Sequence, residues 1–207
     1  MRRTLAAAVL SSASVLLSAQ QAPPGEAPAV PVDQEPRHRV VFANDFVRII
    51  DAVLPPQYVS QNHTHAADNV AVVILPGRDD AAGQARVGFA GFSRGGYTHV
   101  VTNPESGSMR VIDVELRAGD RPLPPAGDVG GQASHVLVLN NSRVRVWRVK
   151  LDGAQSVPEH QHAPGYMSVT VRGGDGPGTW KWHPAGEAAA TIEAGKRPLD
   201  LVEVEPK

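Results

Sequence analysis

The second half of this chain repeats the residue pattern of its first half at a fixed offset, and this repeat restricts the possible folds more than any other feature. Residues 38–66 align without a gap on residues 135–163. The shared residues include the pairs His38/His135, Val41/Val138, Asn44/Asn141, Val47/Val144, Arg48/Arg145, His63/His160 and His65/His162. Self-similarity over such a length indicates the duplication of one supersecondary unit.

The repeated unit carries the sequence pattern of β-strands. Residues 47–52 and 111–116 alternate between two faces, and residues 201–205 mirror the second of these segments. Residues 70–75 form a largely β-branched run that ends at Pro76-Gly77. No segment after residue 20 shows a convincing amphipathic helix of several turns. The 20 glycines and 18 prolines supply turns between short strands, and we therefore predict an all-β fold of the sandwich or jelly-roll type.

The N-terminus has the features of an export signal. Arg2 and Arg3 precede an apolar stretch over residues 5–17, which is too short to span a bilayer, and Leu17-Ser18-Ala19 is an acceptable cleavage site. We predict a signal peptide over 1–19 and a periplasmic or secreted protein with no membrane anchor after cleavage. An uncleaved anchor is the less favoured alternative.

Two segments rich in proline or glycine divide the remaining chain. Residues 20–37 are predicted to be a Pro-rich linker, and residues 119–134 a second linker between the two copies. The copies themselves span 38–118 and 135–207. Each is large enough to bury a modest core.

Charge and cysteine content exclude several classes of function. The chain has 20 Lys and Arg against 21 Asp and Glu, so it offers no broad basic face for nucleic acid. It has no cysteine, which excludes disulfides, thiolate metal ligands and a cysteine nucleophile.

Histidines form the most suggestive chemical pattern. His63-Thr64-His65 places two imidazoles at positions i and i+2, which point to the same face of a strand. A third histidine, His99, follows the turn Gly95-Gly96 and precedes Asn103 by four positions.

These residues resemble the cupin superfamily, and the repeat resembles its two-cupin (bicupin) members. The first cupin motif is G-x5-H-x-H-x3,4-E-x6-G, to which His63 and His65 correspond, although its opening glycine is missing. The second motif is G-x5-P-x-G-x2-H-x3-N, to which Gly96, His99 and Asn103 correspond, with Arg94 in place of the proline. The resemblance implies two tandem double-stranded β-helix (jelly-roll) barrels, and one divalent metal ion held by His63, His65 and His99.

The glutamate of the first cupin motif is absent. Its position falls on Asn69 or, with the longer spacing, on Val70. Asn69 could offer a carbonyl oxygen as a fourth ligand, and Asp68 could substitute only if the turn reorients it. Three neutral imidazoles would leave the ion its full charge and open coordination positions. Such a site suits Fe, Zn, Mn, Ni or Cu. In the alternative interpretation, the histidines only form hydrogen bonds within a vestigial barrel.

The second copy departs further from the motif. His160 and His162 are present, but Tyr166 stands at the glutamate position and Ala189 at that of the third histidine. We predict a degenerate barrel that completes the fold, with a weak second metal site at His160 and His162 as the alternative. The equivalent residues His38 and His135 are expected to have structural roles at the barrel rim and not to be metal ligands.

The function that the resemblance implies is metal-dependent oxygenase (oxidoreductase) chemistry on a small organic molecule, with Asp68 or Tyr97 handling protons. Two other classes stay open: a non-catalytic metal- or ligand-binding module, and a metal-assisted isomerase or lyase. By analogy with cupins, a homodimer is expected. Trp180 and Trp182 share one face of a strand, and packing between the barrels is their expected role.

Overall fold

A computed structural model describes residues 28–75, 85–91, 96–117, 134–158, 160–162, 165–189 and 191–207 of the chain. The predicted signal peptide, the first part of the Pro-rich linker and nearly all of the second linker lie outside these residues.

The described chain is built from β-strands and one short 3-10 helix. The elements of the first half are β1 (Val30–Pro31), η1 (Val32–Gln34), β2 (His38–Ala43), β3 (Val47–Leu54), β4 (His63–His65), β5 (Asp68–Ile74), β6 (Ala85–Ala90), β7 (Tyr97–His99) and β8 (Met109–Leu116). Those of the second half are β9 (His135–Asn140), β10 (Val144–Leu151), β11 (Ser156–Val157), β12 (His160–Gln161), β13 (Tyr166–Arg172), β14 (Trp180–His183), β15 (Ala188–Ala189), β16 (Ile192–Glu193) and β17 (Leu199–Pro206).

This composition agrees with the predicted all-β class. Within the described ranges, no helix has the length and apolar character needed to cross a membrane.

The two halves share one strand topology, as the sequence repeat predicted. Each contains a five-stranded sheet, ordered β2-β3-β8-β5-β6 in the first half and β9-β10-β17-β13-β14 in the second. The burial patterns of β2 and β9 are identical residue by residue, and so are those of β3 and β10. The duplication therefore extends from sequence to strand order and to the faces that each strand buries.

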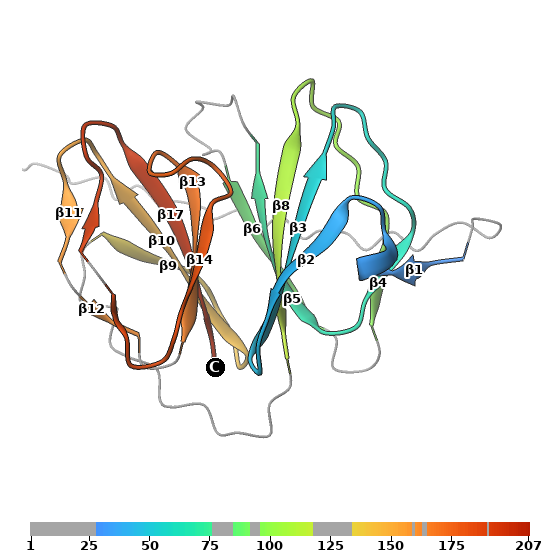
Figure 1. Cartoon of the computed structure of the whole chain (residues 1–207), viewed down its shortest axis with the longest axis horizontal. Coiled ribbons are helices and arrows are strands. Elements are labelled where there is room, and N and C mark those ends of the chain that lie inside the picture. Colours follow the sequence, from blue (N-terminus) through green and yellow to red (C-terminus); the bar gives the residue numbers. More distant parts are fainter. Residues whose placement is uncertain are drawn as a thin grey trace, which may run out of the picture.

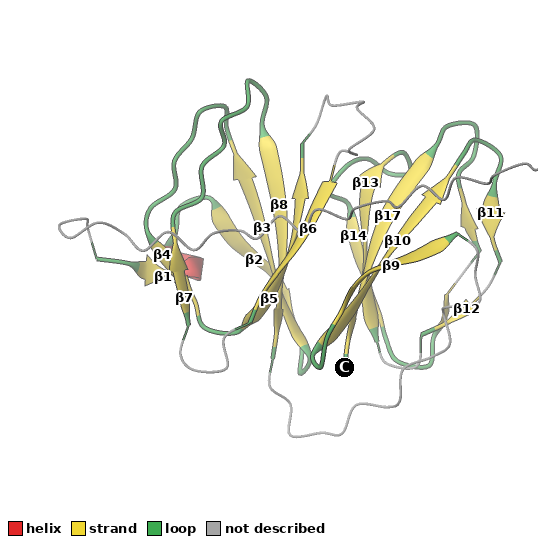
Figure 2. Ribbon diagram, turned by 180° about the vertical axis from the view of Figure 1, so that it is seen from behind, coloured by secondary structure: helices red, strands yellow, loops and turns green. Residues whose placement is uncertain are grey.

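The largest core lies between the two five-stranded sheets. Figure 1 shows these sheets facing one another in the middle of the molecule, and Figure 2 shows the same arrangement from behind. Alternate residues of the central strands meet there, including Ile49 and Ile112 from the first half and Val146, Val169 and Val202 from the second. Strand periodicity explains the arrangement, because residues i and i+2 lie on the same face.

The opposite face of each large sheet is covered by short strands of the same half. These short strands form the sheet β1-β4-β7 in the first half and the pairs β11-β16 and β12-β15 in the second. They lie at the outer ends of the molecule (Figure 1). A small apolar cluster fills the space within each half: Ala52, Leu54, Leu75, Met109 and Val111 in the first, and Val149, Leu151, Val157, Ala194, Leu199 and Leu201 in the second.

Part of the predicted N-terminal linker belongs to the first half. β1 runs parallel to β4, with Val30 in register with His63. Val32 and Glu35 are each 1% exposed. The domain boundary expected at residue 38 therefore does not mark the start of folded structure.

Aromatic side chains join the two halves at one edge of the central core. The Trp182 ring stacks on Phe42 and Phe46, with centroid distances of 6.1 and 6.4 Å, and Trp180 lies 5.8 Å from Phe42. These contacts agree with the predicted packing role of Trp180 and Trp182.

A bidentate ion pair occupies equivalent positions in the two halves with its charges exchanged. Arg110 donates to Asp51 through Nε at 2.9 Å and Nη2 at 2.6 Å. In the second half, Arg148 stands at the position of Asp51 and donates to Asp200 through Nε at 2.9 Å and Nη2 at 2.7 Å. The fold thus accepts either orientation of the pair.

We expect Asp51→Arg to lower the free energy of unfolding by about 1–3 kcal/mol, because two guanidinium groups then face each other. The exchange Asp51→Arg/Arg110→Asp should recover most of this loss, since the second half already uses that arrangement. Urea denaturation of the three proteins measures both effects. A double variant no more stable than Asp51→Arg would show that the two halves do not tolerate the same exchange.

Candidate metal centre

The structure brings His63, His65 and His99 together. His63 and His65 lie on β4, and His99 lies opposite His63 on the neighbouring strand β7. The potential ligand atoms of the three side chains all lie within 4.8 Å of one another. The intervening residues Thr64 and Thr98 meet on the exposed face through their hydroxyl groups. The H-x-H spacing therefore acts as the sequence predicted, with both imidazoles on the buried face of one strand.

Hydrogen bonds fix the orientation of the first two imidazoles. His63 Nδ1 donates to the carbonyl oxygen of Gln61 at 2.8 Å, and His65 Nδ1 donates to Glu115 Oε1 at 3.0 Å. The proton on Nδ1 leaves Nε2 with its lone pair. His63 Nε2 and His99 Nε2 are buried without a hydrogen-bond partner. Such atoms are costly in an empty core and are suited to holding a metal ion.

Burial also keeps the site in the state that a metal needs. Desolvation lowers the pKa of His63 to about 4 and that of His99 to about 2, and neighbouring histidines act in the same direction. Both side chains are therefore neutral at pH 7 and able to donate a lone pair.

Arg48 on β3 and Glu115 on β8 form an ion pair that holds His65 in its orientation, although neither belongs to the group of three histidines. Glu115 accepts from His65 through Oε1 and from Arg48 Nε through Oε2, the latter at 2.6 Å. Burial alone would raise the pKa of Glu115, but the hydrogen bonds from His65 and Arg48 hold it below its usual range. This series of contacts orients a candidate ligand in the way that outer-shell carboxylates do in metalloproteins.

Asn69 lies on β5, at the position where the cupin motif has glutamate. Its Nδ2 donates to Asp113 Oδ1 at 2.7 Å, whereas its Oδ1 is buried without a partner. Asp113 is itself buried, which raises the pKa of its carboxyl group. The contribution of Asn69 as a fourth ligand stays a prediction, with one unpartnered acceptor atom in its favour.

The two residues predicted to handle protons have different surroundings. The Tyr97 ring lies 4.4 Å from the ring of His99, and burial and Asp113 raise the pKa of its hydroxyl group. Asp68 accepts from Arg143 Nε at 2.8 Å, so that its carboxylate takes part in an ion pair with the second half. Tyr97 thus lies beside a candidate ligand, whereas this contact gives Asp68 a role between the halves.

The other two residues of the second cupin motif have structural roles. Gly96 has φ +79°, and a Cβ atom there would lie 3.2 Å from the carbonyl oxygen of His65. The Asn103 side chain is fully buried and donates to the carbonyl oxygens of Leu54, Pro55 and Gly107. Gly96 permits the turn before β7, and Asn103 fixes the loop after it.

Sequence reasoning missed a buried dyad beside the histidines. His38 Nδ1 lies 2.6 Å from Glu35 Oε2, and the Tyr58 hydroxyl donates to Glu35 Oε1 at 3.0 Å. The centroid of the His38 ring lies 4.4 Å from that of His63, and the residue His38 is 4% exposed. The expectation that His38 lies at the barrel rim is therefore wrong. The buried partner of His38 lies in the segment that was expected to be linker.

The second half gathers a different group. His135, His160 and Glu203 have potential ligand atoms within 4.8 Å of one another. His162 lies next to this group, with Nε2 3.2 Å from Glu203 Oε2. His135 is 7% exposed and lies 3.1 Å from Glu203 Oε2, so the predicted rim position of His135 is also wrong. His183 instead contacts Ser168 Oγ at 3.0 Å and stacks on Tyr166, and does not replace the lost third histidine.

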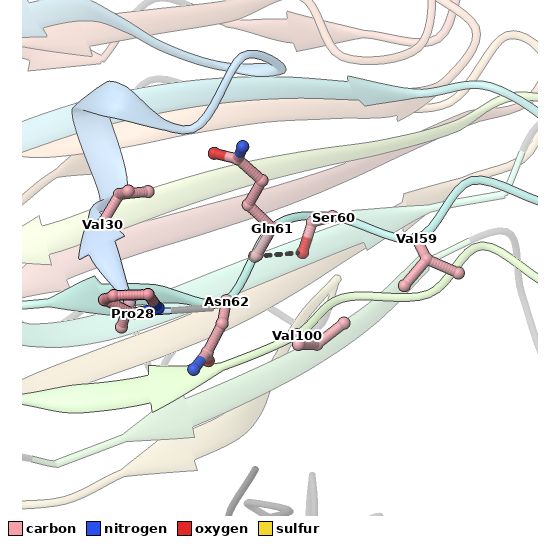
Figure 3. A pocket seen from close by; sticks show the side chains of 8 residues that line it. Pro28, Val30, Val59, Ser60, Gln61, Asn62 and Val100 are labelled. Atoms are coloured by element: carbon pink, nitrogen blue, oxygen red, sulfur yellow. Dashed lines mark hydrogen bonds between the residues drawn. The ribbon is translucent and has the colours of Figure 1, made fainter. Parts of the chain in front are cut away.

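A pocket of about 520 Å³ is lined by residues that flank β4 and β7 in the sequence (Figure 3). Its lining includes Pro28, Val30, Val59, Asn62 and Val100. Asn62 immediately precedes His63, and Val100 immediately follows His99, but the imidazoles themselves do not line the pocket. The pocket is therefore adjacent to the ligand-bearing strands and separate from their inner face.

Comparisons with known proteins identify the fold. No protein-family model and no curated protein sequence match the chain. Among solved structures, AerE from Microcystis aeruginosa is similar with a TM-score of 0.53 and 13% identity, over 86% of this chain and 96% of AerE. A salicylate 1,2-dioxygenase from Pseudaminobacter salicylatoxidans is similar with a TM-score of 0.51 and 10% identity, over 82% of this chain and 76% of the enzyme. The structural neighbours are cupin-fold proteins, and at these identities the likeness concerns the fold alone. The chain thus has the fold of the cupin superfamily.

Proposed function

We propose that this protein is an exported two-cupin protein whose first half binds one divalent metal ion through His63, His65 and His99. The observation that supports this proposal most directly is the convergence of three imidazoles whose ligand atoms lie within 4.8 Å, two of them with an unpartnered buried Nε2. Fe, Zn, Mn, Ni and Cu all suit such a donor set. The predicted signal peptide supports export, and the homodimer expected from cupins completes the proposal.

The chemistry available at this site follows from its neutral donors. When bound, the metal ion supplies a Lewis acid that keeps its full charge, because no carboxylate is among the three ligands. The protein buries the imidazoles and places the Tyr97 ring beside His99. His63 Nδ1 donates its proton to the carbonyl oxygen of Gln61, and His65 Nδ1 donates to Glu115. Burial and Asp113 raise the pKa of the Tyr97 hydroxyl, so it stays protonated at neutral pH and can act as a hydrogen-bond donor.

For the reaction we propose oxygenase chemistry on a small organic substrate. The support is the likeness to cupin-fold enzymes, which include the salicylate 1,2-dioxygenase. A non-catalytic binding module is the second candidate, and one observation favours it. His63 and His65 are 0% and 1% exposed, and they do not line the adjacent pocket.

Oxygen uptake by the Fe(II)-loaded full chain separates these candidates. We expect uptake with at least one member of a panel of phenols, flavonols and diketones, and its loss in His99→Ala. The variant should also hold one metal ion fewer per chain than the wild type by elemental analysis. His183→Ala is the matched control, because His183 contacts Ser168 and lies outside both histidine groups.

Three results would contradict the oxygenase proposal. Metal binding with no turnover of any substrate would leave the binding module. Product formation without oxygen uptake would indicate an isomerase or lyase. Equal metal content in the wild type and His99→Ala would refute the site itself.

A further inference from the structure

The second half keeps the hydrogen bonds that orient the first two imidazoles of the first half. His160 Nδ1 donates to the carbonyl oxygen of Pro158 at 3.2 Å, as His63 does to Gln61. His162 Nδ1 lies 2.8 Å from Glu205 Oε2, and Arg145 donates to the same carboxylate. These contacts correspond to those of His65, Glu115 and Arg48. A half that had lost every ligand role would have no need of this arrangement.

A carboxylate occupies the centre of the second group in place of a third histidine. Ala189 is paired with His160 where His99 is paired with His63. The equivalent of Asp113 in the second half is Glu203, whose side chain is one methylene longer. Glu203 Oε2 lies 3.1 Å from His135 Nε2, and Glu203 Oε1 lies 3.8 Å from His160 Nε2. In the first half the carboxylate of Asp113 is instead bonded to Asn69.

The geometry of this group leaves donor atoms unused. His160 Nε2 and His162 Nε2 are buried without a hydrogen-bond partner, although both lie near the Glu203 carboxylate. An unsatisfied buried nitrogen destabilises the folded state. A cation between His135, His160 and Glu203 would give His160 a partner and balance the buried negative charge.

We propose that the second half binds a second divalent transition-metal ion through His135, His160 and Glu203, with His162 beside Glu203. Glu203 and His135 lie outside both cupin motifs, which supply only His160 and His162 in this half. Two imidazoles and one carboxylate suit zinc and iron(II). All four side chains are at most 7% exposed, which is typical of a closed structural site. The ion would join β9, β12 and β17.

The test is a zinc count on the full chain after chelation and reloading. We expect two ions per wild-type chain, one in His99→Ala, one in His160→Ala and none in the double variant. The isosteric Glu203→Gln should also hold one, and provides a second route if His160→Ala does not fold. His183→Ala, which alters a nearby imidazole outside the group, should keep two. Zinc should raise the melting temperature of His99→Ala but not that of the double variant.

The outcomes separate this site from that of the proposed function. Wild-type metal content in both His160→Ala and Glu203→Gln would refute the second site. The second site would also be refuted if the wild type held one zinc ion per chain and only His99→Ala lost it. The charge of Glu203 would then be balanced by the neighbouring histidines alone. A single ion that is lost only in His160→Ala would support the second site and refute the first.

Discussion

Glu115→Gln is expected to weaken zinc binding at the first site about 10- to 100-fold, although Glu115 is not itself a proposed ligand. Its two carboxylate oxygens accept from His65 Nδ1 and from Arg48 Nε. Glutamine has only one acceptor oxygen, so its NH2 group must face either the imidazole N–H or the guanidinium. His65 then loses its orientation, or Arg48 loses its buried partner. Competition of the protein with a zinc chelator measures the affinity, and the first site is identified as the one that His99→Ala removes.

The second half supplies a matched control for this experiment. Arg145, Glu205 and His162 repeat the same contacts, so Glu205→Gln makes the same chemical change at a comparable depth. It should lower stability in a similar way and leave the affinity of the first site unchanged. Wild-type affinity in Glu115→Gln would show that the carboxylate does not orient His65. An equal loss in both variants would indicate a general effect on folding.

Part of the first site could be predicted from local rules, and the resemblance to the cupin motifs added His99 as the third ligand. Period-2 alternation places His63 and His65 on one face, and the positive φ of Gly96 explains why a glycine precedes the strand that carries His99. The repeat predicted equal strand orders in the two halves, and the two five-stranded sheets have the same order. These features need no knowledge of which strands become neighbours across the sheet.

The roles of the carboxylates could not be predicted, because they depend on pairing between distant strands. β8 and β17 bury both faces, with apolar residues toward the central core and Asp113, Glu115, Glu203 and Glu205 toward the histidines. A signal was present in the sequence. The alternating segments at 111–116 and 201–205 place these acids at matching positions, which indicates a shared buried face.

No sequence pattern indicated that Glu35 would be buried against His38. Its contact with His38 depends on the 3-10 helix after β1, which folds a proline-rich segment onto the first half. Composition alone favoured an extended linker there. Trp180 and Trp182 indicated contact between the halves, but no local pattern indicated that the two large sheets would share one core.

That shared core predicts that the two halves unfold together. Ile112→Ala should lower the free energy of unfolding of the whole chain by about 2–5 kcal/mol, because it removes buried volume where the two sheets meet. The three tryptophans, Trp147, Trp180 and Trp182, all lie in the second half. Their fluorescence therefore reports whether a change in the first half destabilises the second.

In urea, the tryptophan fluorescence and the far-UV circular dichroism of Ile112→Ala should shift to the same lower midpoint. Val53→Ala is the control on the adjacent strand, since Val53 is 47% exposed, and its effect should stay within about 0.5 kcal/mol. Two separate transitions, with the fluorescence midpoint unchanged, would mean that each half is stabilised by its own small cluster. The coincidence of the two probes is expected because, among the residues that the structure describes, 15 buried residues from both halves form the central cluster. The clusters confined to each half contain five and six of the described residues.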